Sequence, residues 1–257
     1  MIRLKIKEKL YTYERVIFPD QQIESDADIV RYMRFYDLEK VPKDVQKDSY
    51  VTPVTNLCLT VEEIQKEYNK EVRYEVRRAD RENITFLIFD KLNISSDIDF
   101  IKELAQKYYK FCDVIEQEHL KDNLNLDEFF EFVKQGNIVV SKAEFENGWT
   151  YHIYQVDGKN AMLWFSFSDY RKEGANKSMA GWANRGLHNY DILYFKEQGY
   201  ERYDWGNIAS FETPNHIDKF KMSFGGEIKT VYGCFVGNTL KGKILIKLRE
   251  LRNKSRV

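Results

Sequence analysis

Residues 138–167 read IVVSKAEFENGWTYHIYQVDGKNAMLWFSF, and this stretch decides the fold class. It contains three strand-like segments rich in β-branched and aromatic residues, joined by Asn147-Gly148 and by Asp157-Gly158. Both dipeptides tolerate the positive φ angles of tight hairpin turns. The stretch therefore predicts an antiparallel meander with strands over 138–145, 149–156 and 161–167.

Helical patterns precede the meander. Thr60 and Glu63 form a capping-box pattern, and apolar residues then recur at helical spacing as far as Ala79, which predicts one helix. The other elements predicted before the meander are a strand over 84–89, a helix opened by Ser96 with Asp99, and a shorter helix over 126–135.

The segments after the meander predict the parallel part of the sheet. Thr213 as cap and Pro214 at the first helical position indicate one helix start. From residue 84 the order is β-α-α-β-β-β-α-β-α-β, which is two helices, a meander and a parallel β-α-β return. The predicted elements are a loop over 169–183, a helix over 184–198, a strand over 200–205, the helix from Thr213 and a strand over 227–236.

The two ends of the chain lie outside this order. Residues 1–58 offer a short strand over 2–6 and a helix over 26–38, and we expect them to form an extension that packs on the core. Residues 59–240 are expected to form one compact domain. Residues 241–257 predict a basic helix whose Leu/Ile face packs on that domain. The alternative is that its basic side chains contact RNA phosphates or an anionic membrane surface.

Composition excludes several classes of protein. The 257 residues include 40 basic and 41 acidic ones, a balance that argues against a protein that coats nucleic acid. The apolar runs are far shorter than the roughly 20 residues that span a bilayer. Three dispersed cysteines without CxxC spacing indicate a reducing compartment and no zinc site. We therefore expect a cytoplasmic protein without a metal, whose membrane contact, if any, is peripheral.

The predicted strand order brings the last meander strand beside the strand over 200–205, in parallel. If these two strands part, they leave a cleft in which the extended part of a ligand can bind like an added strand. The helix after the loop directs its N-terminus, an anion site, at this cleft. The expected donor-binding residues are Arg171 and Gly174 of the loop, with Asn184 as helix cap and Arg185 in the first turn.

Four segments of the C-terminal third form an ordered series. They read LHNYDI (187–192), FKEQG (195–199), YDWG (203–206) and FKMSFGGE (220–227). This series resembles the Fem-type aminoacyltransferases and related envelope acyltransferases of the GNAT superfamily, over residues 59–236. The loop RKEGAN (171–176) is also similar to the R/Q-x-x-G-x-G/A loop of acetyl-CoA-dependent GNATs, without its final Gly or Ala.

The resemblance implies the GNAT fold, an α+β (mixed α/β) architecture in which a mixed central sheet with splayed parallel strands is flanked by helices. It implies an N-acyltransferase with an acceptor amine on an envelope precursor such as an amino sugar. We expect acyl-CoA, above all acetyl-CoA, to be the donor, because a single domain without a large basic face is a poor platform for tRNA. Fem-type enzymes that build peptidoglycan bridges usually have two tandem domains, whereas this chain has room for one. This departure concerns the acceptor more than the fold.

The residue types and their positions indicate the reactive residues, and for Lys221 the resemblance adds support. Lys221 of the FK pair is expected to stabilise oxyanion charge or a donor phosphate, and Asp204 to help remove the proton of the acceptor amine. His216 is a candidate general base, as His188 is to a lesser degree. Gly206 and Asn207, which follow Asp204, are expected to contact the donor. The structural alternatives are a solvated lysine, a local turn capped by Asp204 and ordinary histidines.

Two other functions stay open. The first keeps the fold but uses aminoacyl-tRNA, bound by the basic C-terminal segment and by Arg73, Arg77 and Arg78. The second is a catalytically idle GNAT-fold domain that serves as a binding module. A cleft between the two parallel strands favours an enzyme, and strands paired along their whole length favour the idle module.

Overall fold

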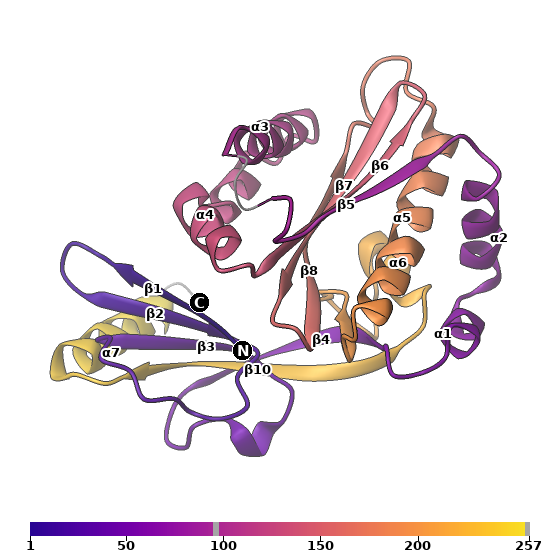
Figure 1. Cartoon of the computed structure of the whole chain (residues 1–257). Helices are drawn as coiled ribbons and strands as arrows, with labels where there is room; N and C mark the ends of the chain where they lie inside the picture. Colours follow the sequence, from indigo (N-terminus) through magenta and orange to yellow (C-terminus); the bar gives the residue numbers. More distant parts are fainter. Residues whose placement is uncertain (95–97, 255–257) are drawn as a thin grey trace. The chain divides into compact units, whose positions relative to one another are not determined.

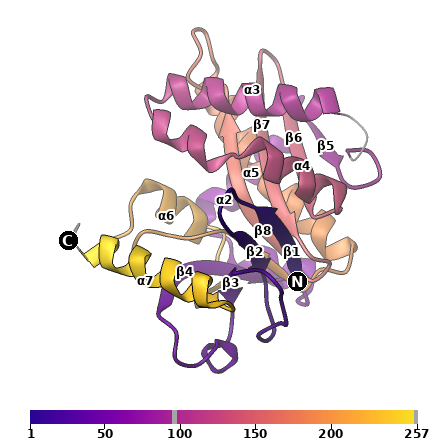
Figure 2. The same ribbon diagram turned by 90° about the vertical axis from the view of Figure 1, so that its left-hand side faces the viewer.

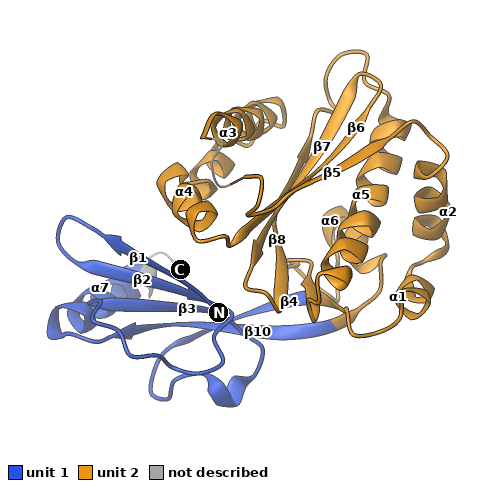
Figure 3. Ribbon diagram, viewed as in Figure 1, with its two compact units in different colours: residues 1–52, 228–257 blue, residues 53–227 orange. Residues whose placement is uncertain are grey.

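The computed structural model describes residues 1–94 and 98–254, so that the predicted helix cap Ser96 lies outside the described part. The chain divides into two compact units, the first formed by residues 1–52 with 228–257 and the second by residues 53–227 (Figure 3). The chain therefore leaves unit 1 and returns to it. The sequence prediction instead grouped residues 228–240 with the acyltransferase domain.

Unit 2 is built on a mixed sheet in which the last residues of β4 (Lys47–Asn56) are followed by β9, β8, β7, β6 and β5. The predicted meander is confirmed, because β6 pairs with β7 and β7 with β8, both antiparallel. Asn147 and Gly158 have the positive φ that their turns require. The strands are β5 (Thr85–Phe89), β6 (Ile138–Phe145), β7 (Gly148–Val156), β8 (Asn160–Ser168) and β9 (Arg202–Asp204).

The parallel strands β8 and β9 part, as predicted. They pair from Asn160 with Arg202 to Met162 with Asp204, whereas β8 continues to Ser168. Beyond the last pair the chain turns away through Gly206, which has φ +73°. A Cβ atom on this glycine would lie 2.9 Å from the carbonyl oxygen of Leu163, so that only glycine fits where the strands separate.

Helices cover both faces of this sheet (Figure 1). α3 and α4 lie over one face, where α3 crosses in front of β6 and β7 in the turned view (Figure 2). α5 lies on the other face, packed against β6, β7 and α2. The helices are α1 (Val61–Glu67), α2 (Lys70–Ala79), α3 (Ile98–Val114), α4 (Leu126–Lys134), α5 (Lys177–Glu197) and α6 (His216–Met222), with a 3-10 turn, η2 (Glu118–Asn123), after α3.

The core of unit 2 lies between α5 and the sheet. Its largest fully buried side chains include Tyr154, Phe195, Tyr203 and Trp205. Phe224, which follows α6, packs on Trp205 with ring centroids 4.6 Å apart. Aromatic packing therefore fixes α5, β9 and α6 against one another.

Two predicted helix starts are wrong. α5 begins at Lys177, because Asn176 rather than Asn184 caps it by accepting a hydrogen bond from the backbone N–H of Met179. Asn184 therefore lies inside the helix. α6 begins at His216, because the capping box of Asn215 and Asp218 overrides the predicted cap Thr213.

The single helix predicted after the Thr60–Glu63 capping box is two helices. The capping box itself is present, as predicted. Tyr68 leaves the helical region with ψ 138°, and Asn69 then caps α2 by accepting from the N–H of Val72. The apolar spacing continues through the break, which is why it predicted one element.

Unit 1 contains a sheet in which β1 pairs with β2, β2 with β3, and β3 with β10. The helix predicted over 26–38 is wrong, since Ile29–Phe35 forms a strand held between two neighbours and buries Tyr32 and Phe35. The elements are β1 (Ile2–Lys7), β2 (Thr12–Ile17), β3 (Ile29–Phe35), η1 (Leu38–Lys40), the first residues of β4, β10 (Glu227–Gly237) and α7 (Leu240–Lys254).

The C-terminal helix α7 does not pack through its leucines. Ile244, Leu248 and Leu251 are 52%, 57% and 56% exposed, which overturns the expected packing of this face. The helix approaches β3 through Gly242, where a Cβ atom would meet the carbonyl oxygen of Asp28. No helix in the described part of the chain is long and apolar enough to cross a membrane.

Candidate functional site

A cleft of about 320 Å³ lies along the end of β8 that extends beyond its pairing with β9. The walls come from the unpaired end of β8, the first half of α5, α3 and α6. Ser166, Asn184 and Arg185 supply polar groups to an otherwise largely apolar lining. The remaining lining residues are Phe111, Phe167, Ser168, Tyr170, Lys177, Ala180, Gly181 and Phe220. An apolar cleft with a few polar groups is the usual form of a small-molecule site.

The loop RKEGAN (171–176) leads directly into α5, because the helix begins at Lys177. Gly174 has φ +76°, and its position has open space around a would-be Cβ atom. Arg171 is exposed and stacks on Tyr170 at 5.2 Å. The shifted helix start thus brings Arg171 and Gly174 to the N-terminus of a helix of 21 residues, where backbone N–H groups can bind anions.

Arg185 lines the cleft but is also bound to α2. Its guanidinium lies 3.1 Å from Glu71 and 2.8 Å from Glu75 and stacks over Phe220 at 5.1 Å. Burial raises the pKa of Glu75, and the positive charge of Arg185 opposes this shift. Arg185 therefore joins α5 to α2 in addition to facing the cleft.

The predicted residues of the β9 turn come together. The buried carboxylate of Asp204 accepts a hydrogen bond of 2.8 Å from the N–H of Gly206, in a local turn. Lys221 donates to the carbonyl oxygen of Asn207 at 2.8 Å. Its Nζ would also lie 3.5 Å from a Cβ atom on Gly206. Lys221, Gly206 and Asn207 therefore form one cluster beside the point where the strands part.

His216 differs from the residues of this cluster because it is exposed. It is the first residue of α6. The structural acid of α6 is Asp218, which accepts backbone hydrogen bonds from Ala209, Ser210 and Asn215. Burial opposes its ionisation, but these donors outweigh burial and keep the pKa of Asp218 below its ordinary value. Asp218 thereby holds the loop before α6 in place.

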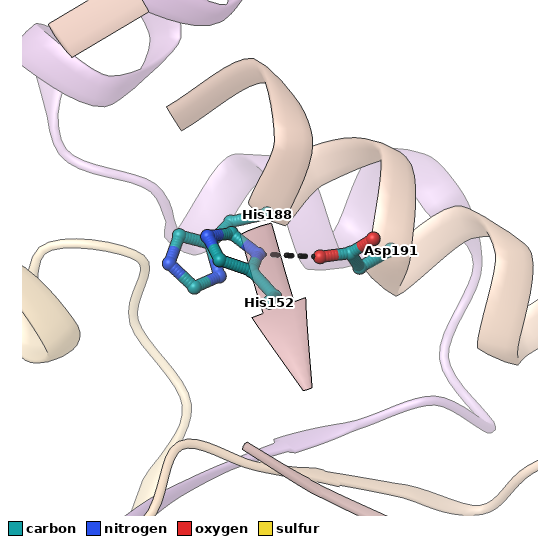
Figure 4. A group of neighbouring side chains, drawn as sticks. All are labelled: His152, His188 and Asp191. Carbon is teal, nitrogen blue, oxygen red and sulfur yellow. Dashed lines mark hydrogen bonds and ion pairs between the residues drawn. The ribbon is translucent and has the colours of Figure 1, made fainter. Parts of the chain in front are cut away.

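A buried polar cluster lies between β7 and α5 (Figure 4), and a hydrogen bond connects it to the cleft residue Asn184. His152 Nδ1 is 2.7 Å from Asp191 Oδ2, and its Nε2 is 2.9 Å from Oδ1 of the cleft residue Asn184. The His152 and His188 rings stack with centroids 3.9 Å apart. All of His152, His188 and Asp191 are 1% exposed or less.

The hydrogen bonds of this cluster have a fixed direction. Burial, and next the charge of Asp191, raises the pKa of Tyr154 well above its ordinary value, so its hydroxyl keeps the proton and donates to Asp191 at 2.5 Å. Tyr203 must then donate to Tyr154 across 2.8 Å, and His188 Nδ1–H to Tyr203 across 2.8 Å. Any other order would place two lone pairs against each other. Burial also lowers the pKa of His188 far below its usual value, so this ring is neutral with its proton on Nδ1.

The same cluster has the composition of a metal site, because ligand atoms of His152, His188 and Asp191 lie within 4.8 Å of one another. The geometry does not fit an ion, however. Imidazole binds a metal in the plane of its ring, at about 2.0–2.1 Å for zinc. Two rings stacked with an interplanar angle of 25° direct their lone pairs side by side rather than at one point. We therefore interpret the cluster as a hydrogen-bond network.

The sequence analysis missed His152 and Asp191. Two signals could have found them. His152 and Tyr154 are two apart in a strand, so both face α5. Asn184, His188 and Asp191 recur at i, i+4 and i+7 on the helix face that also buries Leu187 and Phe195. Polar residues on a buried stripe must find partners with one another.

Comparison with known proteins supports the fold. No family model matches the chain, and no curated protein matches it. Among solved structures, FemX aligns with a TM-score of 0.58 and 11% identity over 90% of this chain and 83% of that one. The C-terminal domain of an Agrobacterium fabrum lysylphosphatidylglycerol synthetase gives 0.52 and 11%, over 85% and 71%. L-PGS from Bacillus licheniformis gives 0.50 and 14%, over 86% and 72%.

At these identities the likeness concerns the fold alone, and it agrees with the fold that the sequence resemblance implied. The fold class is therefore as predicted, a mixed sheet flanked by helices with splayed parallel strands. The alignment with FemX covers more of the chain than residues 59–236, so it extends beyond the segment in which the sequence resemblance was found.

Proposed function

We propose that this chain, which has the fold of FemX and of lysylphosphatidylglycerol synthetase, is an acyltransferase that acylates an amine in the cleft beside β8. The observation that supports this most is the short pairing of β8 with β9, over Asn160 to Met162 only. Beyond Met162, the edge of β8 does not pair with β9, and an extended donor can add there. Ser166 of β8 and Asn184 and Arg185 of α5 give the cleft polar groups.

The chemistry needs no covalent enzyme intermediate. The amine nitrogen of the acceptor attacks the carbonyl carbon of a thioester, the new C–N bond forms and the C–S bond breaks. The amine loses one proton, and the departing thiolate takes one up. We assign stabilisation of the developing oxyanion to Lys221 with the turn of Gly206 and Asn207, and proton removal to Asp204 or His216 through water.

The favoured donor is acyl-CoA, with acetyl-CoA as the first choice. Its support is the position of Arg171, Gly174 and Lys177 at the N-terminus of α5, where a diphosphate can bind. Aminoacyl-tRNA is the second candidate, because FemX shares the fold. Two of the three arginines expected to bind tRNA are engaged locally, however. Arg73 donates to the carbonyls of Lys66 and Tyr68, and Arg78 stacks on Trp182 and pairs with Glu82.

The acceptor is proposed to be an envelope precursor that carries an amine and a negative charge. A second hollow of about 280 Å³ shares Phe111 and Ser168 with the cleft. Lys107, Lys110 and Lys172 line it together with Trp149 and with Asp169, which pairs with Lys172 at 2.7 Å. A cytoplasmic location and peripheral contact of α7 with an anionic membrane belong to this proposal, and they rest on charge balance and on the exposed basic helix.

Ligand-dependent melting tests the proposal. We expect acetyl-CoA, a longer acyl-CoA or aminoacyl-tRNA to raise the melting temperature by about 5 °C or more at roughly 100 times Kd. Arg171→Gln with Lys177→Gln should weaken a CoA donor, whereas the matched change Lys134→Gln on α4 should not. A chain that no donor stabilises would instead be an idle GNAT-fold module.

A further inference from the structure

Asn184 is the residue that connects the cleft to the buried cluster. It lines the cleft from the interior of α5, and its side chain is only partly exposed. Its amide oxygen lies 2.9 Å from Nε2 of His152, which is completely buried on β7. The orientation of this amide therefore depends on whether His152 offers a proton or a lone pair.

Charge balance decides what His152 offers. Asp191 is fully buried, and its Oδ2 accepts from His152 Nδ1 and from the Tyr154 hydroxyl, while Oδ1 has no hydrogen-bond partner. A buried carboxylate needs a counter-charge close by. His152 is the ring in contact with Asp191, and the neighbouring His188 is neutral. The counter-charge must therefore come from His152. An imidazolium at His152 makes the pair neutral and places protons on both of its nitrogens.

A protonated Nε2 can only donate, so it binds the oxygen of the Asn184 amide and not its nitrogen. The Nδ2 amino group is then turned away from His152. Asn184 faces the cleft, and no hydrogen bond of Nδ2 to another described residue is found. Two N–H donors with a fixed direction are therefore left for a ligand.

We propose that Asn184 donates a hydrogen bond from Nδ2 to the carbonyl oxygen of the acyl donor, and that His152 and Asp191 are positioning residues that hold the amide in this orientation. The inference rests on the proposed function, since it assigns a residue to the same cleft. It replaces the predicted role of Asn184 as a helix cap beside a phosphate.

The arrangement suits the chemistry of acyl transfer. As the amine attacks, negative charge gathers on the carbonyl oxygen, and donors that already point at it lower the barrier without having to reorganise. The imidazolium polarises the amide from behind, which strengthens the N–H donors. The buried cluster thus contributes to the cleft although none of its members except Asn184 lines it.

Nitrogen NMR of the four histidines tests the orientation without any substrate. We expect His152 to show protons on both ring nitrogens, and His188 to show a proton on Nδ1 alone. The variant His152→Phe assigns the signals. A neutral His152 with a bare Nε2 would overturn the proposal, because Asn184 would then turn its oxygen to the cleft.

Kinetics test the role. With the donor that stabilises the wild type and a panel of primary amines, Asn184→Leu should lower kcat about 10²- to 10³-fold while KM changes little. Asn184→Asp, which keeps the shape and removes the donors, should lower kcat at least as much. His152→Phe should reduce kcat in the wild-type background and have no further effect in Asn184→Leu, because it acts through the amide.

The matched control is Asn189→Leu. Asn189 lies in the same helix, but its amide oxygen accepts from Gln65 and Tyr68, on the side of α1. This change should reduce stability and leave kcat as it is. If His152→Phe does not fold, Asn184→Asp alone decides the matter. Equal kcat in the wild type and Asn184→Leu overturns this inference and leaves the acyltransferase standing, whereas a wild type that turns over no donor removes both.

Discussion

The helices α5 and α7 reverse the usual distribution of polar and apolar side chains in opposite ways. α5 buries His188 and Asp191 at 1% and 0% exposure, while α7 leaves Leu248 57% exposed. On α5 the polar groups find partners on β7 and β9. On α7 the contact with β3 is made through Gly242, so the leucine side is left outside. Available partners and close approach, rather than hydropathy alone, decide which face is buried.

The largest effect is expected from removing the charge at the centre of the α5 cluster. Asp191→Ala leaves His152 without its counter-charge, which should lower the free energy of unfolding by about 3–5 kcal/mol. Urea denaturation measures this. Glu197→Ala, at the exposed end of the same helix, should stay within about 0.5 kcal/mol. A loss below about 1 kcal/mol for Asp191→Ala would show that no ion pair holds the polar side of α5.

The same truncation made on both helices gives the next largest contrast. Leu187 of α5 is fully buried, so Leu187→Ala should cost about 2–5 kcal/mol through lost contacts and the cavity left behind. Leu248→Ala on α7 should change stability by no more than about 0.5 kcal/mol. Thermal or urea unfolding of the two variants compares them directly. Similar losses at both positions would mean that α7 buries its leucine face after all.

The smallest changes in stability are expected at two glycines of α5. A Cβ atom at Gly186 would lie 2.6 Å from Cβ of Ala79 on α2, so Gly186→Ala should cost about 1–3 kcal/mol. At Gly181 the nearest atom is 3.9 Å away, and Gly181→Ala should raise stability by up to about 1 kcal/mol because alanine favours the helix. Calorimetry should show a loss of stability for Gly186→Ala and a gain for Gly181→Ala. Changes of the same sign in both variants would contradict the close packing of α5 on α2.

Much of the fold could be predicted because local chemistry determines it. The hairpin dipeptides Asn147-Gly148 and Asp157-Gly158 need only neighbouring residues to form their turns. The meander could therefore be predicted from them, and its antiparallel pairing is observed. The strand β3 could not be predicted in the same way. Its residues Ile29–Phe35 form a strand because β2 and β10 lie on either side, and β10 comes nearly two hundred residues later in the chain.

The candidate site was predicted in part. Arg171 and Gly174 lie in the loop directly before α5, but Arg185, expected in the first helical turn, lies eight residues after the true start at Lys177. The helix start was missed because Asn176 and Asn184 are equally good caps by composition. The buried pair of His152 and Asp191 was missed because its partners come from separate elements, and only the packing of α5 on β7 brings them together.

The division of unit 1 between the two ends of the chain affects how the protein folds during synthesis. Residues 53–227 leave the ribosome before residues 228–257, so unit 2 has all of its chain while unit 1 still lacks β10 and α7. Until then, β3 has β2 on one side and no β10 on the other. Unit 1, whose synthesis starts first, is therefore completed last. Translation that stops before β10 leaves β3 with an open strand edge of the kind that promotes aggregation.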